Sequence, residues 1–102
     1  MNKTAKPIAN KSAKHYIFEW CSGRAIEDYI LECHSKCMRW VDIANDMTNI
    51  MCNYFIDRIR EQDKTKKNLW IIRKVCLVTI PHIQIIYKLM GLEANASRKK
   101  YE

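Results

Sequence analysis

The chain has 102 residues, of which 48% are hydrophobic and 28% charged, and it carries a net charge of +7. This apolar content excludes an intrinsically disordered protein, and the length suits one domain. Two glycines and two prolines leave few positions for turns, which favours helices over a many-stranded β fold. We therefore predict an all-α fold, a small helical bundle.

The excess positive charge lies outside the middle of the chain. Residues 1–14 hold four lysines and no acid, whereas residues 15–60 have a net charge of −2. Residues 61–74 contribute +3 and residues 75–102 contribute +2. Such basic ends suit an acidic protein, nucleic acid or an anionic membrane, and they also simply keep a small protein in solution.

The N-terminal region divides into an arm and a short helix. Residues 1–11 are polar and without period, so we expect a flexible basic arm, or one that a partner orders. Ser12 can cap a helix over Ala13 to Cys21, and Gly23 would end it. Its apolar residues at helical spacing are Tyr16, Ile17, Trp20 and Cys21. We expect the tryptophan to dock this helix on the body.

A heptad seam runs through the middle of the chain, with apolar residues at alternating steps of four and three. Its members are Ile26, Ile30, Cys33, Cys37, Trp40, Ala44, Met47, Met51 and Tyr54. The seam predicts one long amphipathic helix over residues 24–60, because no glycine or proline occurs from Arg24 to Ile80. A kink or break between Ser35 and Asp42 is the main alternative.

The second half of this stretch also bears on DNA binding. Residues 42–60 contain Ile43-Ala44 near their start, as a helix-turn-helix motif can, but Thr48 stands where the turn glycine is usual. The apolar period continues through the supposed turn. The sequence therefore predicts a single helix here.

The C-terminal part is the most apolar. Residues 61–68 are polar and predict a reversing loop, after which residues 69–90 repeat the three and four spacing. We expect this segment to pack antiparallel on the long helix. Pro81 predicts a kink or a break at Ile80, with Pro81 opening a second helix that stops at Gly91. The predicted helical domain spans residues 12–91, and residues 92–102 form a polar basic tail.

Two other structures compete for the same segment. The β-branched run from Val75 to Ile86 could form strands around a turn at Pro81 and His82. A membrane span is disfavoured, because the uncharged stretch from Val75 to Tyr87 is shorter than the roughly twenty residues that a bilayer requires. A membrane partner is therefore not expected.

Candidate chemistry is sparse. Cys33, His34 and Cys37 are the only metal-like cluster, and they are weak zinc candidates because no second cysteine pair accompanies them. The cysteines are odd in number and follow no signal peptide, so we expect free thiols and a cytoplasmic protein. No nucleophile, base and acid are spaced as a catalytic set, and no phosphate loop occurs. We predict neither enzyme activity nor a cofactor.

Function is then expected on surfaces. The first hypothesis is a protein-interaction module, an adaptor or inhibitor, whose candidate contacts are Asn45, Asp46, Asn49, Asn53 and Asp57. The second is an accessory protein that binds nucleic acid without sequence preference. Its candidate contacts are Lys3, Lys6, Lys11, Lys14, Lys64, Lys66, Lys67, Arg73, Lys74, Arg98, Lys99 and Lys100. A homodimer would suit the small core, and a viral or mobile-element origin would suit the size.

Overall fold

The computed structural model describes residues 6–62 and 69–93, with side chains described for residues 6–58 and 72–93. The helices of this part are α1 (Ala13–Ser22), α2 (Ile26–Ser35), α3 (Trp40–Gln62), α4 (Leu69–Cys76) and α5 (Ile80–Met90). No strand occurs in these ranges. The all-α prediction is confirmed, and the β alternative for the C-terminal segment is wrong.

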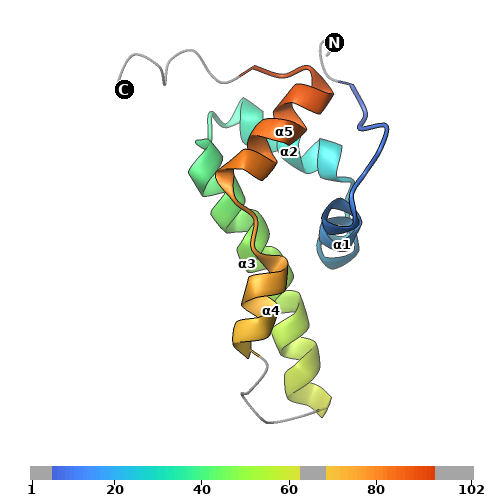
Figure 1. The fold of residues 1–102 in the computed structure, drawn as a ribbon, viewed down its shortest axis with the longest axis vertical. Helices are drawn as coiled ribbons and strands as arrows, with labels where there is room; N and C mark the ends of the chain where they lie inside the picture. Colours follow the sequence, from blue (N-terminus) through green and yellow to red (C-terminus); the bar gives the residue numbers. More distant parts are fainter. Residues whose placement is uncertain (1–5, 63–68, 94–102) are drawn as a thin grey trace.

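The longest helix, α3, lies at the centre of the fold. It contacts α1, α4 and α5, and α1 also contacts α2. Figure 1 shows α4 running back along the second half of α3 and α5 lying over α2 and the first half of α3. The molecule is flat, with extents of 45 × 30 × 19 Å, and α4 and α5 together form its front layer in this view.

Helix α1 begins and ends where the sequence indicates. The Ser12 hydroxyl accepts the His15 backbone N–H at 3.3 Å, and Gly23 ends the helix in the left-handed conformation at φ 73°. The residue that docks the helix differs from the prediction. Phe18 is fully buried against Tyr29, whereas Trp20 is 72% exposed. The tryptophan therefore lies on the surface, and phenylalanine anchors α1.

The predicted long helix is divided into α2 and α3. After Ser35 the chain enters a Schellman turn, in which the Met38 N–H donates to the Cys33 carbonyl at 3.1 Å. Cys37 takes the left-handed position of this turn, at φ 58°, which glycine usually occupies. The prediction of one long helix is wrong, and the alternative of a break between Ser35 and Asp42 is right. The sequence does not mark this turn, because its left-handed position holds a cysteine and not a glycine. From Trp40 onwards α3 is continuous through Thr48, so it contains no helix-turn-helix.

The C-terminal segment is two helices, so the predicted break is right and the alternative of one helix kinked at Pro81 is wrong. Residues 77–79 separate α4 from α5, and Pro81 lies in the first turn of α5, where its missing N–H costs nothing. Thr48 on α3 holds this link, because its hydroxyl oxygen accepts the Val78 N–H at 2.9 Å. Gly91 ends α5 at φ 73°, as predicted. No helix in the described ranges is long and apolar enough to cross a membrane.

The core follows the predicted seam except at the break and at the last seam position, Tyr54, which is half-buried. Its fully buried members include Ile26, Ile30, Met47 and Met51 from the seam and, from the C-terminal segment, Ile83, Ile86 and Met90. Cys37 leaves the core because it lies in the turn. A heptad pattern therefore selected the correct buried face of both helices, although it does not show where one helix stops.

Residues 6–11, part of the expected flexible arm, pack on the body. Ile8 is 5% exposed, and its backbone N–H donates to the Glu27 carboxylate at 2.9 Å. The Lys6 N–H donates to the Met90 carbonyl at the end of α5. Burying an isoleucine side chain contributes about 1.5–3 kcal/mol, so this part of the arm is a structural strap. Residues 1–5 lie outside the described ranges.

Candidate protein-interaction site

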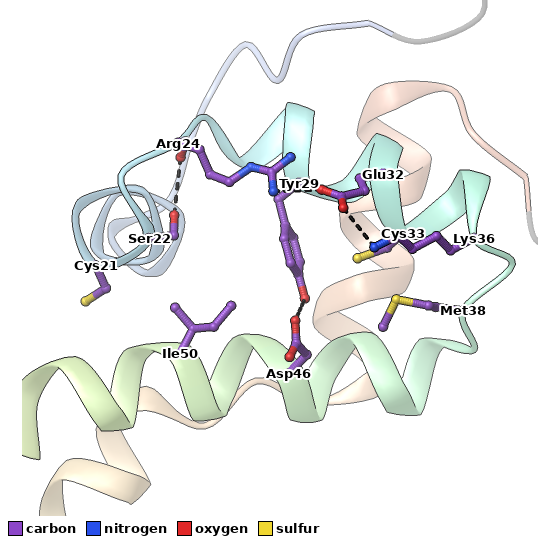
Figure 2. A pocket seen from close by; sticks show the side chains of 10 residues that line it. All are labelled: Cys21, Ser22, Arg24, Tyr29, Glu32, Cys33, Lys36, Met38, Asp46 and Ile50. Atoms are coloured by element: carbon purple, nitrogen blue, oxygen red, sulfur yellow. Dashed lines mark hydrogen bonds and ion pairs between the residues drawn. The ribbon is translucent and has the colours of Figure 1, made fainter.

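A pocket of about 430 Å³ lies between α1, α2 and α3, on the face of α3 away from α4 and α5. Figure 2 looks into it. Its lining residues are Cys21, Ser22, Arg24, Tyr29, Glu32, Cys33, Lys36, Met38, Asp46 and Ile50. The volume falls within the range of about 300–1,000 Å³ that is typical of small-ligand pockets.

The floor of the pocket is apolar and rigid. Tyr29 crosses it from α2 to α3, and its hydroxyl donates to Asp46 Oδ2 at 2.6 Å. Burial and the neighbouring Asp46 carboxylate raise the pKa of Tyr29 well above its usual value, so the phenol stays protonated as a donor. Met38 and Ile50 flank this bond and supply half-buried apolar surface. Tyr29 therefore joins α2 to α3 across the pocket.

The rim along α2 carries charge of both signs. Glu32 pairs with Arg24 at 2.7 Å and with Lys36 at 2.8 Å, so the three residues form a ladder along the helix. Hydrogen bonds from Lys36 and Arg24 lower the pKa of Glu32. With Asp46 opposite, the pocket is lined by two cations and two anions. Protein interfaces also have a polar rim around an apolar centre.

An aromatic group extends the site along α1 and α3. The indole N–H of Trp20 donates to the Tyr54 hydroxyl at 2.9 Å. The Arg58 guanidinium stands 4.4 Å from the centre of the Tyr54 ring. On α1 the pocket residue Cys21 comes directly after Trp20, and on α3 Tyr54 lies one turn after the pocket residue Ile50. Tryptophan, tyrosine and arginine are the residue types that dominate binding energy at protein interfaces.

The structure places the predicted protein-binding residues on the outside of α3. Asn45, Asp46, Asn49, Asn53 and Asp57 are all exposed. Asp46 alone among them lines the pocket. Asn49 and Asn53 follow it at i+3 and i+7, which places them on the same side of the helix. These two residues therefore continue the α3 rim beyond the pocket.

Sequence reasoning missed the α1 and α2 walls of the site. Phe18 and Tyr29 position these helices, but neither stands out among the apolar residues of a helical stripe. The one available signal was the charge spacing of Arg24, Glu32 and Lys36, since i, i+4 and i, i+8 pairs lie along one helix edge.

The three metal candidates do not converge. Cys33 is buried, and burial raises the pKa of its thiol, which disfavours the thiolate that zinc requires. Cys37 is exposed in the turn after α2. His34 points toward α5 and the residues just after it. Its Nε2 lies 3.0 Å from the Glu93 carbonyl oxygen, and its ring packs against Tyr87. Across the described residues no three His, Cys, Asp or Glu side chains are grouped to hold a metal, and all five cysteines are unpaired thiols.

The nucleic-acid candidates fall into three groups. Lys3, Lys64, Lys66, Lys67, Arg98, Lys99 and Lys100 lie outside the described residues. Lys6, Arg73 and Lys74 are exposed. Lys11 and Lys14 are used within the fold: Lys11 pairs with Glu19 at 2.7 Å and Glu27 at 3.1 Å. The Lys14 ammonium donates to the Leu77 carbonyl at the α4–α5 link.

Comparison with known proteins finds no matching family model, no matching curated protein and no matching solved structure.

Proposed function

We propose that this chain is a small non-enzymatic protein-interaction module, an adaptor or inhibitor that binds a larger protein through the pocket between α1, α2 and α3. The observation that carries this proposal is the apolar floor at Met38, Ile50 and the Tyr29 ring, enclosed by a rim of balanced charge. A floor of this kind accepts an apolar side chain of a partner, and the rim supplies ion pairs around it.

The neighbouring aromatic group supports the same function. Trp20 is 72% exposed although it is the largest side chain type, and its indole is already oriented by the bond to Tyr54. A side chain held in one position before binding loses less conformational entropy when a partner covers it. We therefore expect Trp20 and Arg58 to be hot spots, residues whose replacement by alanine costs much of the binding free energy.

A matched pair of serine substitutions tests the proposal. Ser22→Trp introduces a bulky side chain into the pocket from the end of α1, whereas Ser35→Trp adds the same side chain at the exposed end of α2, outside the pocket. Each tagged variant and the unaltered chain would be used for affinity capture from the native host, and the recovered partner would be purified and titrated.

We expect a stoichiometric protein partner whose affinity falls at least tenfold with Ser22→Trp and stays within twofold with Ser35→Trp. Recovery of no stoichiometric partner would contradict the proposal. Equal affinity of both variants for the partner would show that binding occurs elsewhere on the molecule.

A second candidate function is sequence-independent binding of nucleic acid. It is supported by the run from residue 64 to residue 92, which holds six basic residues and no acidic one. Its weakness is that Lys11 and Lys14 are already used within the fold. A titration against generic duplex and single-stranded nucleic acid at two salt concentrations tests it, and absence of salt-sensitive binding at micromolar protein would contradict it.

A further inference from the structure

The outer surface of α4 and α5 is unusually apolar. Five of the eight large hydrophobic residues exposed in the described ranges belong to this segment: Val75, Leu77, Ile80, Ile85 and Leu89. Val75 and Ile85 are 58% and 54% exposed. On α5 the opposite side is apolar as well, with Ile83, Ile86 and Met90 buried. A helix that is apolar on both sides normally has both sides covered.

The same surface is cationic. Between Asp63 and Glu93 the sequence has no acidic residue. Arg73, Lys74 and Lys88 are exposed on α4 and α5. A partner that binds this apolar surface therefore has to be anionic or compatible with nearby positive charge.

Helices α4 and α5, which carry these residues, both pack on α3 and lie on one side of a thin molecule. Figure 1 shows α4 and α5 in the front layer, joined by residues 77–79. In Figure 2, which looks into the pocket, they lie behind α2 and α3. The basic and apolar surface therefore faces away from the pocket, and both can be occupied at once.

From this placement we infer that the outer surface of α4 and α5 docks on the surface of an anionic lipid bilayer, with the aliphatic side chains in the headgroup region and the cations on lipid phosphates. An apolar surface bordered by lysine and arginine binds anionic bilayers without spanning them. The aliphatic composition favours lipid over protein, because leucine and valine are under-represented among the residues that dominate protein interfaces. It also favours lipid over nucleic acid, where aromatic side chains stack on bases.

Co-sedimentation with vesicles tests this inference on the full chain. Vesicles of phosphatidylcholine alone are compared with vesicles that also contain phosphatidylserine, at low and at physiological salt. Two variants alter the surface: Ile85→Ser with Leu89→Ser removes aliphatic side chains, and Arg73→Gln with Lys88→Gln removes charge. The matched controls are Tyr16→Ser with Val41→Ser, which removes exposed apolar side chains elsewhere, and Lys36→Gln with Arg39→Gln, which removes the same charge elsewhere.

We expect binding to the phosphatidylserine vesicles only. Each cation near the surface contributes about fivefold to partitioning, so Arg73→Gln with Lys88→Gln should weaken binding roughly 25-fold. The serine variant should lose the binding that remains at physiological salt, and both control pairs should bind like the unaltered chain. Circular dichroism of every variant verifies that it is folded.

Three results would overturn the inference. They are equal binding to both vesicle types, a serine variant that binds like the unaltered chain, and vesicle binding that the two control pairs weaken as strongly as the surface variants do. Salt-sensitive binding of a generic oligonucleotide, unaffected by the serine variant and without vesicle binding, would assign the surface to nucleic acid. Ser22→Trp does not touch the surface of α4 and α5, so the two proposals are tested separately. A negative vesicle assay does not affect the proposed pocket function. A negative partner titration does not affect the inference about the bilayer.

Discussion

At the scale of single residues, Cys37 lies at the turn that divides the central apolar stretch. Its φ of 58° is in the left-handed region, which costs an L residue about 1–2 kcal/mol relative to the right-handed helix. The Met38 N–H bond to the Cys33 carbonyl and the packing of Trp40 on Tyr87 fix the chain on either side. The turn is therefore imposed by its surroundings and carries a local cost.

Cys37→Gly should remove part of this cost. Glycine adopts positive φ without penalty, although it also gives the unfolded chain more freedom, so we expect the free energy of unfolding to rise by about 0.5–1 kcal/mol. Urea unfolding followed by circular dichroism measures the change. Ser35→Gly, within the last turn of α2, is the control and should lower stability instead. A stability loss with Cys37→Gly would show that the thiol has a role that the turn geometry does not explain.

Phe18 and Trp20 differ in what they contribute, although both are large aromatic residues of α1. Phe18 is fully buried beside Tyr29, with ring centres 4.8 Å apart, whereas Trp20 makes one surface hydrogen bond. Phe18→Ala should therefore cost about 3–5 kcal/mol of unfolding free energy, and Trp20→Ala less than about 1 kcal/mol. The comparison uses the same urea titration. Similar losses for the two variants would contradict the assignment of Phe18 as the anchor.

At the scale of elements, one lysine joins the N-terminal strap, α1 and α2. Lys11 lies between Glu19 and Glu27, and each carboxylate also accepts a backbone N–H, from Ile26 and Ile8 respectively. Partial burial alone would raise the pKa of both carboxyl groups, but the backbone N–H bonds and the Lys11 ammonium outweigh it and lower both values. The hydrogen bond from Lys11 to Glu19 in turn raises the pKa of Lys11.

These shifts give a pH dependence with a definite sign. Because the folded pKa values of Glu19 and Glu27 lie below the unfolded value of 4.5, their stabilisation is present above that pH and is lost as pH falls through the folded values. Lys11→Met should lower stability by about 1 kcal/mol near neutral pH and move acid unfolding to higher pH. Lys36→Met is the control, since Lys36 is more exposed. An unchanged acid midpoint for Lys11→Met would show that the cluster does not couple the three elements.

The elements also show what the sequence can and cannot predict. Ser12 begins α1 through its side-chain hydroxyl, and Gly23 and Gly91 end α1 and α5 through their left-handed backbone. These local signals predict α1 and the end of α5 correctly. The α2–α3 break depends on long-range packing around Cys37, which no local residue marks. The same applies to the candidate site: Asp46 was predicted from its exposed row, but the pocket around it requires Tyr29 and Arg24, which reach it only after α2 folds back on α3.

At the scale of the whole molecule, the fold gives two different faces to a small, flat protein. One holds the pocket, whose charges balance, and the other carries the cationic, aliphatic surface of α4 and α5. Helix α3 contacts α1 on the pocket face and α4 and α5 on the other face. Ligands on the two faces would therefore bind to opposite sides of the same helix. This arrangement suits a module that connects a protein partner to a second surface.

The most direct test of the central claim is amide hydrogen exchange of this chain alone and in complex with its captured protein partner. We predict slower exchange on binding at the end of α1, along α2 and in the first half of α3, where the pocket residues lie. We expect no change in α4 and α5. Protection confined to α4 and α5, or no protection around the pocket, would contradict the assignment of the pocket as the protein-binding site.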